Sequence, residues 1–169
     1  AVLMLFGMSH IFGVFGTIRF SVVALKMSEL RGIDFAVLIP SFLLFFAGLG
    51  YKIACVPFHM WSPDVYEGSS AALAGFISVV PKVAGFVVMM RIFEGLIASN
   101  VVWVEYMIYA IAVLTMTLAN IWALVQKDVK RMLAYSSISH AGFVMVAVMV
   151  GTTEANTSIF LYWILFSFT

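Results

Sequence analysis

One lysine, Lys82, lies in the middle of a long apolar run and so poses a question of chemistry. No other charged residue occurs between Ser69 and Met90. A charged side chain at membrane depth is energetically unfavourable and usually marks an ion or proton pathway. Because burial favours the neutral amine and a nearby carboxylate favours the charged one, such a group can load and release protons. The alternative is a hydrogen bond between helices with no role in transport.

The residues just before Lys82 suggest how its amine is accommodated. Pro81 directly precedes it, and Ser78 lies one helical turn earlier. Proline lacks a backbone donor and clashes with the carbonyl four residues back, so Pro81 predicts a helix break. We expect the freed carbonyls and the Ser78 hydroxyl to hydrate the amine. Ser69 is about 20 Å of helix away, at about 1.5 Å per residue, which makes extension of the lysine to the membrane surface awkward.

A second group of polar residues, between Tyr51 and Trp61, combines a lysine, a proline and a histidine. Pro57 predicts a kinked or broken helix beside Lys52. Breaks at membrane depth are tolerated only where protein or water satisfies the backbone. Lys52 and His59 are seven positions apart, nominally on one helix face, so they are predicted to border a hydrated pocket. Alternatively, Lys52 extends to the interface and His59 bonds a loop carbonyl.

A third candidate, His140, follows three serines in Ser136-Ser137-Ile138-Ser139-His140. An imidazole has an unperturbed pKa of about 6.5, which suits a proton relay. Small hydroxyl residues also let helices pack closely, so a packing role for the serines is equally open. Asp64 and Glu67 lie in the turn-rich stretch 61–68, where they serve local geometry as readily as ion handling.

Composition identifies the surroundings of these residues. Hydrophobic residues make up 64% of the 169 positions and charged residues only 10%, against about 25% charged in soluble domains. The chain is therefore predicted to be an integral membrane protein. The net charge of +1 gives no sign of nucleic-acid binding, and no metal or haem spacing is present. The lone Cys55 cannot form a disulfide within the chain.

Charge and turn residues divide the chain into apolar segments, since a bilayer span needs about 20 apolar residues. Apolar segments of this length, without the alternation of apolar and polar residues that strands show, are typical of helices. The predicted fold is therefore all-α, a polytopic transmembrane helix bundle with a broken helix near Pro57. We treat 1–169 as a single membrane domain, part of a larger subunit. Its six expected segments, the first and last truncated, are Ala1–Ile18, Phe35–Met60, Ser69–Phe93, Val101–Val125, Met132–Val150 and Thr157–Thr169.

Topology is ambiguous from the distribution of basic residues. If every segment crosses once, one side of the membrane has Arg19, Lys26 and Arg31, and the other has Lys127, Lys130 and Arg131. The short loop with its compact basic cluster favours 126–131 as the cytoplasmic side.

Three separate motifs together resemble one family. They are the run Tyr51-Lys52…Val56-Pro57-Phe58-His59-Met60-Trp61-Ser62-Pro63-Asp64-Val65-Tyr66-Glu67-Gly68, then Lys82, then Gln126 to His140. In this order they resemble the antiporter-like membrane subunits of respiratory complex I, over essentially the whole chain. The sequence motif VPFHMWSPDVYEG is most similar to that of subunit N (subunit 2).

The resemblance implies a subunit of a proton-translocating NADH:quinone oxidoreductase. The family's two central channel lysines map onto Lys52 and Lys82, and its relay histidine onto His140; His59 is a further candidate for the proton path. Pro57, Asp64, Glu67 and Pro81 are assigned to the channel loop and helix breaks. An acidic partner of the first lysine and a later lysine are expected outside 1–169.

Further expectations follow from the resemblance. No cofactor, metal or catalytic residue is expected in this chain, because NADH, flavin, iron–sulfur centres and quinone are used by other subunits. Its expected partners are other membrane-arm subunits, the lipid bilayer, protons and water. The expected location is the bacterial inner membrane, ahead of an organellar membrane. Two alternatives remain, a subunit of a secondary cation/proton antiporter and a purely structural membrane subunit.

Overall fold

The computed structural model describes residues 2–27, 33–98 and 102–168, and every regular element in these ranges is an α-helix. The helices are α1 (Val2–Phe15), α2 (Phe20–Met27), α3 (Ile33–Ile53), α4 (Trp61–Gly68), α5 (Ala71–Ala98), α6 (Val102–Val125), α7 (Val129–Val150) and α8 (Thr153–Ser167). Four of them, α3, α5, α6 and α7, are long and apolar enough to cross a membrane. The predicted all-α transmembrane bundle is confirmed.

The helix break near Pro57 is also confirmed. Helix α3 ends at Ile53 and α4 begins at Trp61, and the chain between them turns through Ala54, whose φ is 59°. Backbone groups in this break find partners: Cys55 N donates to the Gly50 carbonyl at 3.0 Å, and Val56 N to Thr115 Oγ1 of α6 at 3.1 Å. The neighbouring helix therefore satisfies a donor that would otherwise be buried without a partner.

Two local expectations were wrong. The stretch 61–68 is the helix α4 rather than a turn-rich loop, because Pro63 lies in its first turn, where a missing backbone N–H is harmless. Helix α5 continues through Pro81 without a break. One lost donor is tolerated in a long helix that is otherwise intact, and transmembrane helices accommodate proline in this way.

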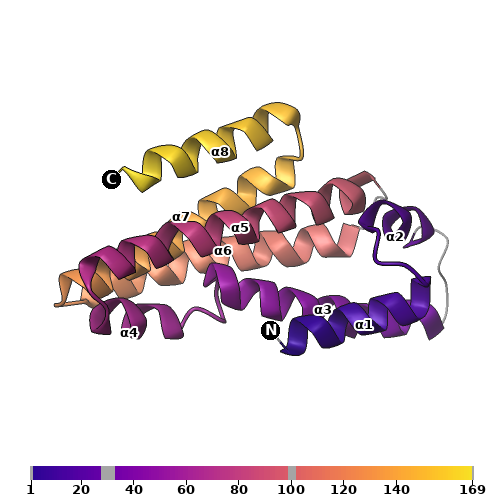
Figure 1. Ribbon diagram of the computed structural model, residues 1–169, viewed down its shortest axis with the longest axis horizontal. Coiled ribbons are helices and arrows are strands. Elements are labelled where there is room, and N and C mark those ends of the chain that lie inside the picture. Colours follow the sequence, from indigo (N-terminus) through magenta and orange to yellow (C-terminus); the bar gives the residue numbers. More distant parts are fainter. Residues whose placement is uncertain (1, 28–32, 99–101, 169) are drawn as a thin grey trace.

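The helices form an elongated bundle with α5, α6 and α7 side by side, α1 along α3, and α4 tucked against one end (Figure 1). Helix α7 is the most buried of the four spans and contacts α4, α5, α6 and α8. Residues on α4, α5, α6 and α8 therefore all lie close to α7.

Small residues allow close helix contacts at two crossings. A methyl group added at Gly142 of α7 would lie 2.7 Å from Met116 Cγ and 3.2 Å from the Ala112 carbonyl oxygen, both on α6. A methyl group at Gly85 of α5 would lie 2.4 Å from Ile53 Cγ2 at the end of α3. Glycine at these positions brings the backbones together, as is usual in membrane bundles.

Candidate functional site

The amine of Lys82 is the centre of the site. Its side chain reaches from α5 to α7, where Nζ donates to the Ser137 carbonyl oxygen at 2.7 Å and to Ser137 Oγ at 2.6 Å. Both residues are only 2% exposed. No described residue forms an ion pair with Lys82. The amine is therefore desolvated and, among the described residues, held by neutral oxygens alone.

The partner expected for Lys82 from the sequence is not the one observed. The Ser78 hydroxyl donates to the Gly75 carbonyl within α5 at 2.7 Å and lies at an exposed position. Ser137, 55 residues away along the chain, takes its place. The tie between α5 and α7 supports the alternative of a structural hydrogen bond as well as a transport role, because both need the same contact.

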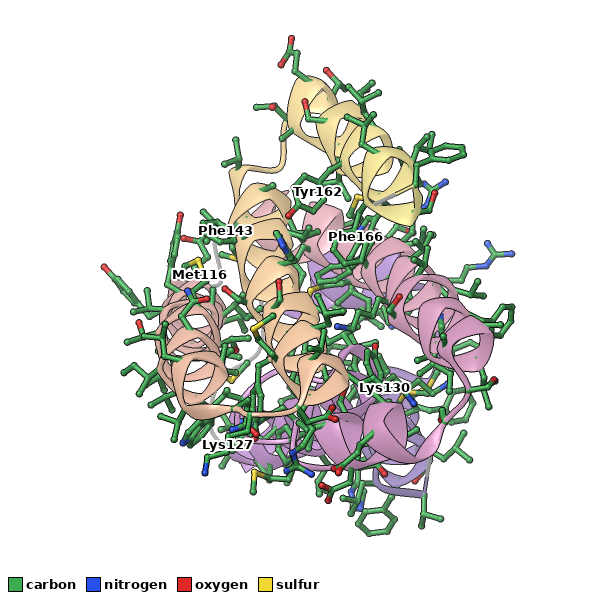
Figure 2. The ribbon with its side chains drawn as sticks, turned by 90° about the vertical axis from the view of Figure 1, so that its left-hand side faces the viewer. Met116, Lys127, Lys130, Phe143, Tyr162 and Phe166 are labelled. Carbon is green, nitrogen blue, oxygen red and sulfur yellow. The ribbon has the colours of Figure 1, made fainter. Side chains whose placement is uncertain are left out.

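His140 lies three residues after Ser137 on α7, about one helical turn along. Its Nδ1 forms a short hydrogen bond with the Tyr162 hydroxyl of α8, and its ring meets Phe166 edge-on at 5.2 Å. Figure 2 shows Tyr162 and Phe166 projecting from α8 toward α7. The structure thus places His140 about one helical turn from Ser137, the residue that binds the Lys82 amine.

Lys52 has a different environment. It is exposed at the end of α3, and no hydrogen bond or ion pair joins its ammonium to a described residue. Because α3 ends at Ile53, the helix-face argument that placed Lys52 and His59 together does not apply. His59 is 2% exposed and lies within the break, two residues before α4 begins. Any partner of Lys52 comes from outside the described residues.

His59 is buried among aromatic rings. Its imidazole stacks on Trp122 of α6 with ring centres 4.9 Å apart and planes 18° apart, and Tyr135 of α7 lies at 6.4 Å. Neither ring nitrogen has a hydrogen-bond partner among the described residues. The alternative of a hydrogen bond from His59 to a loop carbonyl stays a prediction.

The two acidic residues of α4 hold this helix against the start of α7. Arg131 Nη1 donates to Asp64 Oδ1 and to Glu67 Oε2, both at 2.7 Å. Lys130 Nζ adds bonds to the Glu67 and Ser69 carbonyls at 3.3 and 2.9 Å. These groups are partly exposed, so Asp64 and Glu67 position α4 rather than line the buried part of the site.

Three functional side chains were missed from the sequence alone. Ser137 was considered only as one of several serines, and Tyr66 and Tyr162 were not considered. Tyr66 is 4% exposed and lies on α4, which packs against α7. The spacing of His59, Ser62 and Tyr66, three and then four residues, was the available signal. In the described ranges, no group of three or more His, Cys, Asp or Glu is placed to hold a metal ion.

Comparison with known proteins gives a consistent result. The family model described as NADH:quinone oxidoreductase/Mrp antiporter, transmembrane, matches residues 1–169. Subunit N of NADH-quinone oxidoreductase from Sulfurimonas denitrificans is 55% identical over 164 residues, which are 97% of this chain and 33% of that protein. The chain thus spans about a third of the length of this relative. The resemblance to subunit N is confirmed.

Solved structures share the arrangement of helices. The archaeal membrane-bound sulfane sulfur reductase, a respiratory membrane complex, matches with a TM-score of 0.83 and 27% identity over 98% of this chain and 34% of the matched one. Respiratory complex I from Thermus thermophilus matches with a TM-score of 0.75 and 28% identity over 96% and 34%. Similarity to these membrane complexes and the four apolar spans agree that the chain is an integral membrane protein.

Proposed function

Because the chain belongs to the NADH:quinone oxidoreductase/Mrp antiporter family, we propose that it is part of a proton-translocating membrane-arm subunit of an NADH:quinone oxidoreductase. The subunit works beside other membrane-arm subunits in a bacterial inner membrane, as its bacterial relatives suggest. It moves protons while NADH, flavin, iron–sulfur centres and quinone react in other subunits. This chain itself performs no redox step.

One observation carries the proposal: an amine in the middle of a span that is 2% exposed and bound by neutral oxygens alone among the described residues. Desolvation disfavours the ammonium, whereas the two acceptors on Ser137 favour it. A change of charge nearby therefore shifts the balance between the two forms of Lys82. Redox chemistry elsewhere in the complex supplies that change through the electrostatics of the membrane arm.

The path runs through the lysines and histidines that the motifs single out. Lys52 responds first, and Lys82 and His140 pass the proton onward through water. The place of His140 one helical turn from Ser137, which binds the Lys82 amine, supports their neighbouring places in the path. The Lys52 side chain is exposed, so proton transfer to and from Lys52 needs groups from outside the described residues.

The test is proton translocation by the complex that contains the full-length subunit with Lys82→Met. Methionine keeps the length and apolar stem of lysine but carries no proton, so NADH-driven translocation and quinone reduction fall in an assembled complex. Lys127→Met is the matched control, because Lys127 is exposed at the edge of the molecule (Figure 2). Full activity of the Lys82→Met complex contradicts the proposal.

The family description also includes Mrp antiporters, which favours one second candidate, a subunit of a cation/proton antiporter. That candidate predicts sodium-dependent proton exchange in vesicles without NADH. Lys82→Met abolishes this sodium-dependent exchange as well, so the variant does not distinguish the two functions. The need for NADH distinguishes them, because only translocation by the oxidoreductase depends on it.

A further inference from the structure

Helix α6 holds the α3–α4 break at two points. Val56 N donates to Thr115 Oγ1 at 3.1 Å, and the His59 ring stacks on Trp122 with ring centres 4.9 Å apart. Thr115 and Trp122 are seven residues apart, which places them on the same side of α6, about two turns from one another. The stack is a contact between two flat faces, whereas the hydrogen bond fixes one backbone atom of the break. Thr115 therefore sets where the break lies along α6.

The Thr115 hydroxyl acts as donor and acceptor at once. Oγ1 donates to the Ile111 carbonyl, one turn earlier on α6, at 2.6 Å, and it accepts from Val56 N. A hydroxyl has a single proton, so the bond to Ile111 commits that proton and leaves a lone pair for the Val56 N–H. Thr115 is 0% exposed, and a buried backbone N–H without an acceptor is unfavourable. Thr115 thus supplies an acceptor that the interrupted helix cannot supply itself.

The end of α3 has a backbone conformation that requires such support. Ala54 has a φ of 59°, in the left-handed region that favours glycine, and the bond from Cys55 N to the Gly50 carbonyl closes the helix end around it. A non-glycine residue in this region persists where its surroundings determine it. Ala54 is 0% exposed and belongs to one buried cluster with Ala119, which lies one turn beyond Thr115 on α6. Helix α6 therefore supports the turn as well as the atom that follows it.

The place where α3 ends matters for both lysines of the proton path. Lys52 lies in the last turn of α3. Its neighbour Ile53 packs on Gly85 of α5, since a methyl group added at Gly85 would lie 2.4 Å from Ile53 Cγ2. Gly85 follows Lys82 by three residues, about one turn of α5. A shift of the end of α3 would therefore move Lys52 and alter the packing beside Lys82 together.

We propose that Thr115 is a positioning residue for proton translocation, whose hydroxyl fixes the end of α3 through Val56 N and so places Lys52 relative to Lys82. The role rests on the proposed function and adds to it a residue of α6, a helix to which the motifs assign no part of the site. Thr115 neither gives nor takes the translocated proton, because its own proton stays on the bond to the Ile111 carbonyl.

Thr115→Val in the full-length subunit, measured within its complex, is the decisive variant. Valine has nearly the shape of threonine but no acceptor, so Val56 N loses the one bond that it makes to a described residue. We expect NADH-driven proton translocation to fall about tenfold, as for a lost hydrogen bond that places a reacting group. The number of protons moved per NADH oxidised falls with it. A merely structural role would reduce the amount of assembled complex and leave that number unchanged.

Two smaller substitutions at the same position isolate the hydroxyl. Thr115→Ser and Thr115→Ala both remove the methyl group, and they differ from one another only in the oxygen that Val56 N needs. We expect the serine variant to move as many protons per NADH as the wild type, and the alanine variant to resemble Thr115→Val. Thr117→Val is the control on the same helix, because Thr117 is exposed.

The outcomes separate this role from the proposed function. Loss with Thr115→Val and Thr115→Ala, but not with Thr115→Ser or Thr117→Val, supports the positioning role. A wild-type number of protons per NADH with Thr115→Val, alongside inactive Lys82→Met, overturns it and leaves the proposed function standing. Wild-type translocation with Lys82→Met overturns both.

Two further results would also overturn the positioning role. Equal loss with Thr115→Ser and Thr115→Ala would mean that the methyl group acts through packing. Failure of the valine and alanine variants to assemble, while the serine variant assembles, would mean that the hydroxyl serves folding alone.

Discussion

Lys82 and Lys52 are both lysines of apolar helices, but the fold treats them in opposite ways. Lys82 is 2% exposed and held by two oxygens of Ser137 at 2.7 and 2.6 Å. Lys52 is exposed and has no partner among the described residues. The protonation of a buried amine depends on its protein neighbours, whereas that of an exposed amine depends on what covers it. The described residues therefore enclose the Lys82 side chain, whereas they leave that of Lys52 exposed.

Arg131 adds a third case to this comparison. It has two carboxylate partners, both at 2.7 Å, yet its side chain is 30% exposed. Like Lys82, it has hydrogen-bond partners among the described residues, and like Lys52, its side chain is accessible to solvent. Because solvent screens such pairs, Arg131 serves to hold α4 on α7, and its charge is fixed. Burial, more than the presence of a partner, distinguishes Lys82 as a group able to change its protonation.

The largest effect that sharpens this comparison is expected from Ser137→Ala. The substitution removes one of the two acceptors of the Lys82 amine and leaves the carbonyl, so the ammonium loses part of its stabilisation. We expect translocation to fall about tenfold in an assembled complex. Ser136→Ala is the matched control, since Ser136 is the adjacent serine and has no recorded hydrogen bond through its hydroxyl. Equal activity of the two variants would show that Ser137 Oγ does not support Lys82.

An intermediate effect is expected from Gly85→Ala on the helix that carries Lys82. The new methyl group would lie 2.4 Å from Ile53 Cγ2, at the end of the helix that carries Lys52. We expect the free energy of unfolding to fall by about 1–3 kcal/mol. Thermal denaturation of the purified protein measures this loss. Gly75→Ala in the same helix is the control, because nothing lies within 4 Å of its added methyl group. If both variants melt alike, the close crossing of α3 and α5 is not a constraint.

The smallest effect is expected from Arg131→Gln. Two exposed ion pairs are lost, so the melting temperature drops slightly, and the drop diminishes as salt concentration rises. Lys127→Gln, an exposed neighbour without a recorded partner, controls for the loss of positive charge. A drop that persists at high salt would mean that Arg131 acts through packing rather than through charge.

Much of the fold could be predicted from local patterns. Long apolar stretches gave the transmembrane helices, and Pro57 gave the break, because both depend on residues close together in the sequence. The same rule was wrong for Pro81, since the effect of a proline depends on its position within a helix. Pro63 lies in a first turn, and Pro81 in a long helix that continues past it.

The site was less accessible to sequence reasoning. Lys82 and His140 could be singled out because a titratable group stands out in an apolar run. Ser137 could not be matched to Lys82, because the two are 55 residues apart and meet only through the packing of α5 on α7. The exposure of Lys52 was equally hidden, since it depends on which helices cover the end of α3.

The most direct test of Lys82 as a proton carrier is NADH-driven proton translocation by an assembled complex with Lys82→Arg. Arginine keeps the positive charge and the hydrogen-bond donors that face Ser137, but it does not lose its proton under these conditions. The account predicts that translocation is lost, as with Lys82→Met, while the complex still assembles. Wild-type translocation by the assembled Lys82→Arg complex would contradict it, because charge and hydrogen bonding alone would then suffice.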